Sequence, residues 1–170
     1  MAAAADLSRL AVNDGGDIAL RLAPGTGFRV LIADHRGAAL GRVDVAAGDG
    51  VSGVATSGRH GRSLSLGIAD SVTALAADAA AADAAATLIA NAVDLPGHPA
   101  IGRLPADRLV PDSDLGDRPV VTACGALSAA ERAQALRSGA GAAEAMRRRG
   151  LVRAAFLHLR GETVVVGDGE

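Results

Sequence analysis

Two oxygen-bearing side chains, Asp83 and Thr87, stand four residues apart in an alanine-rich stretch without Gly or Pro, which predicts a helix. Side chains at this spacing project from the same face of a helix. A carboxylate beside a hydroxyl can share a hard cation such as Mg²⁺, with water and substrate phosphate completing the ligands. The spacing therefore allows a metal site, which is one of two interpretations that stay open. The alternative is a solvated Asp and a Thr bonded to its own backbone.

A second candidate is the turn from Asn13 to Asp17, which contains the adjacent glycines Gly15 and Gly16. Two glycines remove steric bulk and expose backbone amides to an approaching ligand. A tight hairpin turn also needs glycine for its geometry, so both interpretations stay open.

Hydroxyl and guanidinium groups gather in a third, Gly-punctuated segment, which could form an anion cradle or a solvated loop. Its polar members and glycine are Thr56, Ser57, Gly58, Arg59, His60 and Arg62. Outside these segments the candidates are weaker. Cys124 follows an apolar strand without a nearby His and is interpreted as an inert thiol, and His158 as a packed, hydrogen-bonded side chain. No catalytic residue is identified.

The elements that must position these groups follow from the patterning. Strands are expected over residues 10–12, 18–22, 28–33, 39–45, 51–56, 72–75, 119–124, 155–159 and 163–166. Helices are expected over 78–92 and from a capping box at Ser128 to 149, with an interruption near 139–141. Residues 94–118 are the least regular stretch, with room for one short helix. The sum is a mixed α/β (α+β) fold with a largely antiparallel sheet and packed helices.

Composition and charge argue against several classes of protein, including nucleic-acid-binding and membrane-spanning proteins. A chain of 170 residues suits one domain, and its net charge of -2 offers no basic field for nucleic acid. A single cysteine favours a reducing cytoplasm. The N-terminus lacks the features of a signal peptide, and Asp78 and Asp83 argue against a membrane span over 74–93.

Three segments in one order resemble the ApbE family of flavin transferases. Residues 12–18 (Val-Asn-Asp-Gly-Gly-Asp-Ile) look like its Asn-x-Gly-Gly-Asp-Ile turn, and 54–58 (Val-Ala-Thr-Ser-Gly) match its Ala-Thr-Ser-Gly stretch. Residues 71–87 are similar to its Ser-Val-Thr strand and Ala-Asp-Ala-x-x-Thr helix. With Asp-Ser-Asp-Leu-Gly-Asp at 112–117, the closer resemblance is to an uncharacterised bacterial and archaeal branch of that superfamily.

The resemblance implies an ApbE-like fold, FAD as donor, Mg²⁺ at its diphosphate, and transfer of FMN to a Thr or Ser of an acceptor protein. It places Asp83 and Thr87 on the metal. The flavin nucleotide would lie against Asn13, Gly15, Gly16, Asp17, Thr56, Ser57 and Gly58.

The chain also departs from the ApbE pattern. The family's His-Ile-Ile-Asp-Pro-x-Thr-Gly segment is replaced by residues 61–70, so neither His60 nor Asp70 is equated with it. Only a short segment precedes Asn13, so the chain is expected to be the C-terminal portion of a longer fold, and one interpretation is that a homo-oligomer completes the cleft. These departures favour two alternatives to transfer: a silent module that binds FAD or another nucleotide, and a structural or assembly subunit without a ligand.

Overall fold

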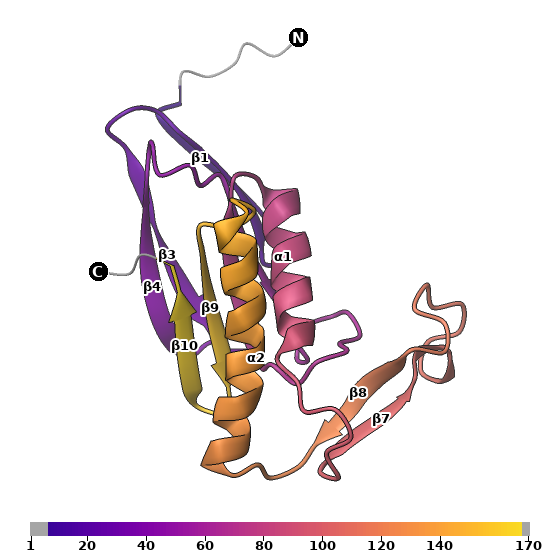
Figure 1. The fold of residues 1–170 in the computed structure, drawn as a ribbon. Helices are drawn as coiled ribbons and strands as arrows, with labels where there is room; N and C mark the ends of the chain where they lie inside the picture. Colours follow the sequence, from indigo (N-terminus) through magenta and orange to yellow (C-terminus); the bar gives the residue numbers. More distant parts are fainter. Residues whose placement is uncertain (1–6, 168–170) are drawn as a thin grey trace.

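The computed structural model describes residues 7–167, which form ten strands, two α-helices and one 3₁₀ turn (Figure 1). The strands are β1 (Arg9–Asp14), β2 (Asp17–Leu22), β3 (Gly27–Ala33), β4 (Ala39–Ala46), β5 (Gly53–Ser57), β6 (Ser71–Ala76), β7 (Ile101–Pro105), β8 (Pro119–Cys124), β9 (Ala154–Leu159) and β10 (Glu162–Val166). The helices are α1 (Ala79–Ala92) and α2 (Ala129–Arg148), and the 3₁₀ turn is η1 (Ala106–Arg108).

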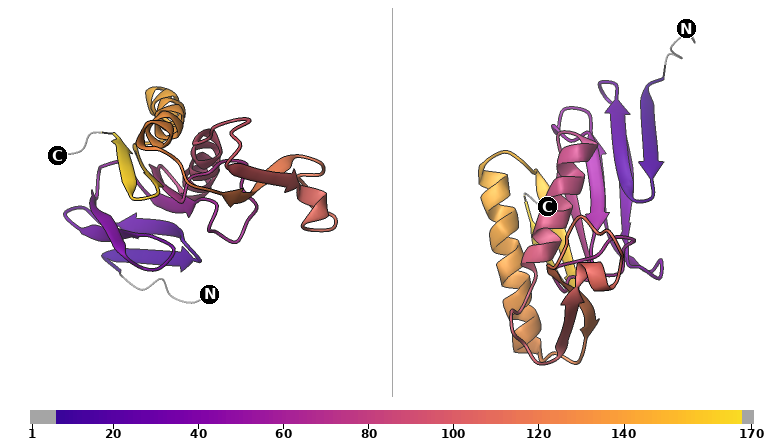
Figure 2. Two further views of the ribbon diagram at one scale, coloured as in Figure 1. Left: turned by 90° about the horizontal axis from the view of Figure 1, so that it is seen from below. Right: turned by 90° about the vertical axis from the view of Figure 1, so that its right-hand side faces the viewer.

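Six strands form one antiparallel sheet in the order β1-β2-β5-β6-β9-β10. Helices α1 and α2 lie side by side on one face, and the β3–β4 hairpin lies on the other (Figures 1 and 2). The expected fold, a largely antiparallel sheet with packed helices, is confirmed for the described residues.

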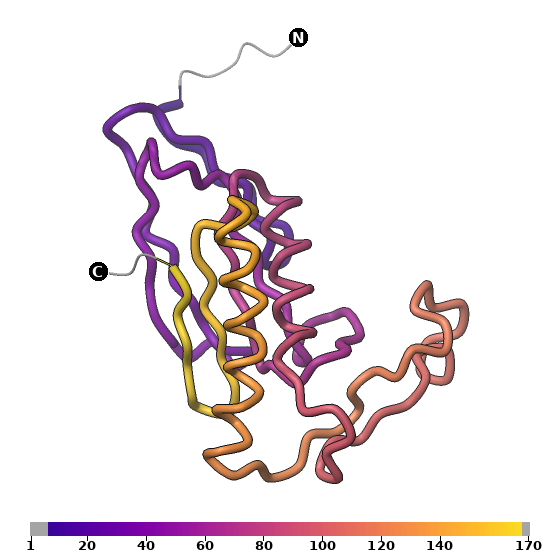
Figure 3. Tube along the Cα trace, in the orientation of Figure 1, coloured from indigo at the N-terminus to yellow at the C-terminus, as the bar shows by residue number. Residues whose placement is uncertain are grey.

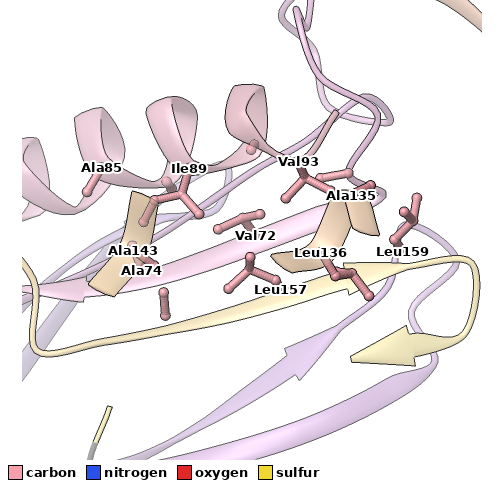
Figure 4. Packing of buried hydrophobic residues seen from close by; sticks show 14 of the residues in the cluster. Val72, Ala74, Ala85, Ile89, Val93, Ala135, Leu136, Ala143, Leu157 and Leu159 are labelled. Atoms are coloured by element: carbon pink, nitrogen blue, oxygen red, sulfur yellow. The ribbon is translucent and has the colours of Figure 1, made fainter. Parts of the chain in front are cut away.

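The main core lies between the sheet and the two helices (Figure 4). Val72 and Leu157 project from β6 and β9 towards Ile89 of α1 and Leu136 of α2, and all four are at most 2% exposed. Buried alanines fill most of the remaining space on α1. Small side chains let the helices approach the sheet closely, which compensates for a core with few large residues.

Each helix begins at the cap that the sequence indicates. The Asp78 carboxylate accepts from the Ala81 amide at 2.8 Å, and Ser128 and Glu131 form a reciprocal capping box. The expected interruption of the second helix is wrong, because α2 runs unbroken through Gly139 and Gly141. Gly139 lies where α2 meets the core: a Cβ there would stand 2.3 Å from Val93 Cγ2, whereas one at Gly141 would meet nothing within 4 Å.

These two glycines give a matched stability test. Gly141→Ala is expected to raise the free energy of unfolding by about 1 kcal/mol, the usual helix-propensity gain. Gly139→Ala is expected to lower it by about 1–2 kcal/mol, because overpacking against Val93 and Leu157 outweighs that gain. Urea unfolding of both variants measures the two changes in the free energy of unfolding. Equal effects would contradict the close packing of α2.

Strands β7 and β8 form a separate hairpin that projects from the body, as the tube in Figure 3 shows most clearly. Strand β7 lies inside the stretch for which only a short helix was expected, and that helix is the turn η1. The strand was missed because it is short and ends at Pro105, and its pairing with β8 is set by the tertiary structure.

Within residues 7–167, no helix combines the length and hydrophobicity needed to cross a bilayer. Residues 1–6, which contributed to the expectation about a signal peptide, lie outside the described part of the chain.

Candidate functional site

Two neighbouring cavities open where the β1–β2 turn, the end of β5 and the loop over residues 58–70 meet. We call the one beside α1 the acid cavity, with a volume of about 430 Å³, and the one beside β3 the hairpin cavity, with a volume of about 350 Å³. They share a wall made by Gly15, Thr56, Ser57, Gly58, His60 and Gly61. Every residue that the sequence predicted for a nucleotide or metal lines one cavity or both.

The acid cavity collects oxygen donors from three elements. Asp83 and Thr87 come from α1, Asp17 from the start of β2, and Ser57 from the end of β5. The Thr87 hydroxyl donates to Ser57 Oγ at 3.3 Å, which ties the helix to the strand. This bond differs from the alternative weighed for Thr87, in which its hydroxyl binds a carbonyl of its own helix.

Asp17 lies in the acid cavity close to other negative charges. Burial raises the pKa of Asp17, the negative charges of Asp83 and Asp14 raise it further, and only the nearby Arg62 guanidinium acts in the opposite direction. Ionised Asp17 is therefore held beside like charge. A divalent cation between the carboxylates would replace this electrostatic repulsion with attraction.

The donor set suits a hard cation with an incomplete protein shell. Mg²⁺ usually takes one or two carboxylates from the protein, with water and substrate phosphates as its other ligands. Asp17, Asp83 and the hydroxyls of Thr87 and Ser57 match that pattern. No cluster of three or more His, Cys, Asp or Glu suited to a metal occurs in residues 7–167, so phosphate oxygens would have to complete the site.

The β1–β2 turn shows why its glycines are there. Gly15 and Gly16 have φ of 66° and 119°, and the Gly16 amide donates to Asn13 Oδ1 at 3.0 Å. A Cβ at Gly16 would meet nothing within 4 Å, whereas one at Gly15 would lie 2.3 Å from Arg62 Nη2. The turn thus needs glycine for its geometry, and it also places bare backbone at both cavities.

Asp17→Asn should stabilise the ligand-free protein. Because the folded pKa of Asp17 is raised, its protonated form is favoured at low pH, and this advantage is lost as pH rises through that pKa. The neutral Asn is expected to raise Tm by about 1–2 °C at pH 7. The gain should vanish near pH 3, where Asp17 itself is protonated. Calorimetry at both pH values tests this, and a lower Tm for the variant at pH 7 would contradict it.

The hairpin cavity lies between the β3–β4 hairpin and the sheet. Val30, Ile32 and Val54 contribute apolar walls. The hydroxyls of Thr56 and Thr73 are bonded to each other at 2.8 Å across β5 and β6. The cavity therefore combines apolar walls with a polar floor.

Two imidazoles stand at this cavity. The rings of His35 and His60 are stacked with centroids 3.9 Å apart. Burial lowers the pKa of His60, and the charges of Arg59 and His35 lower it further, against the opposing effect of Asp70. Near pH 7 the His60 ring is therefore neutral.

Asp70 holds the loop over residues 58–70 in place. Its Oδ1 accepts from Arg59 Nε at 2.9 Å, from Arg59 Nη2 at 2.6 Å and from His60 Nε2 at 3.2 Å, while Oδ2 accepts from the Arg160 amide. Burial acts to raise the pKa of Asp70, but the bonds from Arg160 and Arg59 outweigh it and lower the pKa. Gly58 belongs to the same arrangement, because a Cβ there would lie 2.5 Å from the Asp70 carbonyl oxygen.

Two buried polar residues lie opposite each other on β6 and β9, and one of them, Ser71, which the sequence analysis missed, lines the hairpin cavity. Ser71 and His158 are each 7% exposed, and Ser71 Oγ and His158 Nδ1 are buried without a hydrogen-bond partner. The expectation that His158 is packed and hydrogen-bonded is confirmed, because its side chain is buried and its Nε2 accepts from the Gly161 amide at 3.2 Å. Each orphaned group costs about 1–3 kcal/mol. Only the pairing of β6 with β9 brings these two residues together.

Cys124 lies outside both cavities. Its side chain is half-buried on β8, and Sγ lies 3.8 Å from the Gly125 carbonyl oxygen, which it contacts as a weak donor. No role in either cavity follows for this thiol.

Sequence comparison places the chain in a family other than the one its motifs resemble. The family described as AbpE bacteria matches residues 1–165, nearly the whole chain, and the ApbE family gives no match. The identification as ApbE-like, including its uncharacterised branch, is therefore wrong. Part of the misleading pattern has a structural cause: Gly15, Gly16 and Gly58 meet local backbone requirements. No curated protein and no solved structure matches the chain. The chain belongs to the family described as AbpE bacteria.

Proposed function

We propose that this protein binds a flavin dinucleotide, FAD, together with Mg²⁺, and transfers FMN from it to a Thr or Ser hydroxyl of an acceptor protein. One observation carries the proposal: Asp17 and Asp83, from different elements, face one cavity beside the bonded hydroxyls of Thr87 and Ser57. Two acids that share a cavity and are only partly offset by Arg62 favour a cation, and an incomplete oxygen shell favours a phosphate-bearing ligand.

The shape of the paired cavities supports a dinucleotide. The acid cavity suits a metal-bound diphosphate, and the adjoining hairpin cavity has the apolar walls that a ring system needs. Arg62 adds a guanidinium, which can bond phosphate oxygens. The Gly15–Gly16 turn lines both cavities and lets a ligand approach the backbone.

In the proposed transfer, the acceptor hydroxyl oxygen forms a bond to the FMN phosphorus. The bond from that phosphorus to the bridging oxygen breaks, AMP leaves, and the hydroxyl proton passes to solvent. Asp17, Asp83, Thr87 and Ser57 would hold the metal, and Arg62 would orient the diphosphate. Bound Mg²⁺ would offset the charge of the diphosphate and of departing AMP.

A titration with FAD, with and without Mg²⁺, tests binding. Flavin absorbance and fluorescence report FAD binding directly, because the protein contains no Trp or Tyr whose signal would overlap with that of the flavin. Saturable binding that requires Mg²⁺ is expected, and its absence would refute the proposal. Mass spectrometry of a Thr- or Ser-containing acceptor then tests transfer. Binding without an FMN adduct would leave a silent binding module, and no binding at all would favour a structural subunit.

A further inference from the structure

Strand β1 forms one edge of the six-stranded sheet, and no described segment pairs with its outer side (Figure 2). All six of its residues are exposed, and among them Leu10 and Val12 are 44% and 57% exposed. The strand pairs with β2 in continuous register, contains no proline, and carries charged residues only at its two ends. Proteins usually protect free edges with bulges, prolines or charges, so β1 is open to pairing with another strand.

The hairpin of β1 and β2 has little support from the rest of the sheet. Among the described residues, β2 pairs with β5 only at Ile18 and Ala19. Two-stranded hairpins are marginally stable in water, and a third strand usually stabilises them. An additional strand on the free side of β1 would supply this support.

The direction of the backbone groups of β1 follows from two hydrogen bonds. The Ser8 carbonyl accepts from the Ala23 amide at 2.8 Å, so the even-numbered residues of this segment bond to β2. The amide of Leu20, which lies opposite Ala11, donates at 2.8 Å to the segment that precedes β5 instead. The odd-numbered residues of β1 therefore direct their amides and carbonyls to the free edge. They are Arg9, Ala11 and Asn13.

The side chains of β1 divide between the two faces of the sheet. Arg9 Nη1 donates to the Gly27 carbonyl oxygen at 3.2 Å, and the Arg9 guanidinium lies 5.5 Å from the centre of the Phe28 ring. The odd-numbered residues therefore face the β3–β4 hairpin, and Leu10 and Val12 lie on the helix face. These two side chains form an exposed apolar strip next to the free edge.

A second copy of the chain matches this edge. Two identical antiparallel strands related by a two-fold axis perpendicular to the sheet place one residue opposite its own copy. With Ala11 at this centre, Leu10 of each copy lies opposite Val12 of the other. The outward-pointing amides and carbonyls of Arg9 and Asn13 then bond each other across the axis, as do those of the two Ala11 residues.

The neighbouring registers fit less well. A centre at Val12 places the apolar Leu10 opposite Asp14, and a centre at Leu10 places Val12 opposite Ser8. Only the register centred on Ala11 brings both apolar side chains of each copy together and sets the Ser8 hydroxyl opposite the Asp14 carboxylate. No like charges face each other in it, so the edge complements itself in polarity and charge.

We propose that two copies of this protein associate through antiparallel pairing of their β1 strands, centred on Ala11, so that their sheets form one continuous sheet. The interface consists of backbone hydrogen bonds along the edge and of an apolar cluster made by Leu10 and Val12 of both copies. The proposal does not depend on the flavin or metal site. In this register Ser8 of the second copy lies beside the turn from Asn13 to Asp17, which walls both cavities.

Sedimentation equilibrium of the full chain measures the association. We expect a mass that rises with protein concentration from 16.8 kDa to twice that value. Val12→Lys should raise the dissociation constant of the dimer about tenfold or more, because it places a charge in the apolar cluster. Val165→Lys is the matched control and should leave this constant unchanged: Val165 is 58% exposed on β10, the opposite edge of the sheet.

Ala11→Pro tests the backbone hydrogen bonds separately. Proline removes the Ala11 amide, which points to the free edge, so no bond to β2 is lost. We expect this variant to be monomeric, with the circular dichroism spectrum of the parent protein. Val12→Lys changes only an exposed side chain, which keeps the test valid if the proline variant folds poorly.

Cysteine substitutions test the register. In a Cys124→Ser background, Leu10→Cys and Val12→Cys chains are mixed and oxidised. Opposite residues of a non-hydrogen-bonded pair have Cα atoms about 4.5 Å apart, which is within the range of a disulfide. We expect a disulfide between the two different chains and little in either chain alone.

Three results would overturn the proposal. A single-chain mass at concentrations up to about 1 mM would exclude the dimer. Equal weakening by Val12→Lys and Val165→Lys, or assemblies that grow beyond two chains, would show that β10 takes part and that β1 does not pair with its own copy. An efficient disulfide in Val12→Cys or Leu10→Cys alone would contradict the register centred on Ala11.

Discussion

Asp83→Ala is expected to raise the Kd for FAD in the presence of Mg²⁺ by about a hundredfold or more. The physical reason is charge. Without Asp83 the cavity loses one of the two carboxylates that face it, and the remaining Asp17 repels the diphosphate unless a cation intervenes. Titration of flavin absorbance at several Mg²⁺ concentrations measures the effect.

The matched control is Asp114→Ala, an exposed acid between β7 and β8 that lines neither cavity. It should bind FAD like the parent protein. Thr87→Val should weaken binding about tenfold, and Thr87→Ser should restore it, because the metal needs only the hydroxyl. If the Asp83→Ala variant folds normally and its Kd for FAD in the presence of Mg²⁺ is unchanged, the proposed metal site is refuted.

Asp70→Asn is expected to lower the free energy of unfolding by about 3–5 kcal/mol, the cost of breaking a buried ion pair. The Asp70 side chain is 9% exposed and the paired Arg59 side chain 19%, so the substitution leaves Arg59 poorly solvated and without its carboxylate. The same change loosens the loop over residues 58–70 that walls both cavities, so FAD binding should weaken as well. Urea unfolding at pH 7 measures the change in the free energy of unfolding.

The lowered pKa of Asp70 predicts how the stability difference between the parent protein and Asp70→Asn changes with pH. Because the folded pKa of Asp70 is lowered, its stabilisation is complete above the unfolded value of 3.8 and is lost as pH falls through the folded value. The difference between parent and Asp70→Asn should therefore shrink below about pH 4. Asp44→Asn is the control: Asp44 pairs with Arg29 in similar geometry but is 63% exposed, so no measurable change is expected. Equal losses in the two variants would contradict the role of Asp70.

The sequence determined the local features of this protein. Short apolar runs between Gly-rich turns indicate most of the sheet strands, Asp78 and Ser128 mark the helix starts, and the spacing of Asp83 and Thr87 places both on one cavity-facing side of α1. These features depend on contacts between residues close in the chain, which is why periodicity and capping rules identify them. The motifs did not identify the family, because residues such as Gly58 are required by backbone packing alone.

Only the tertiary structure decided which distant groups meet. Asp17 joins Asp83 at the acid cavity, Asp70 joins Arg59 and Arg160, and Ser71 faces His158, through pairings between segments separated by tens of residues. The same holds for strand β7, which depends on its partner β8, and for Gly139, whose small size matters only because α2 packs against Val93. Register and packing are properties of the whole chain, so no local pattern encodes these contacts.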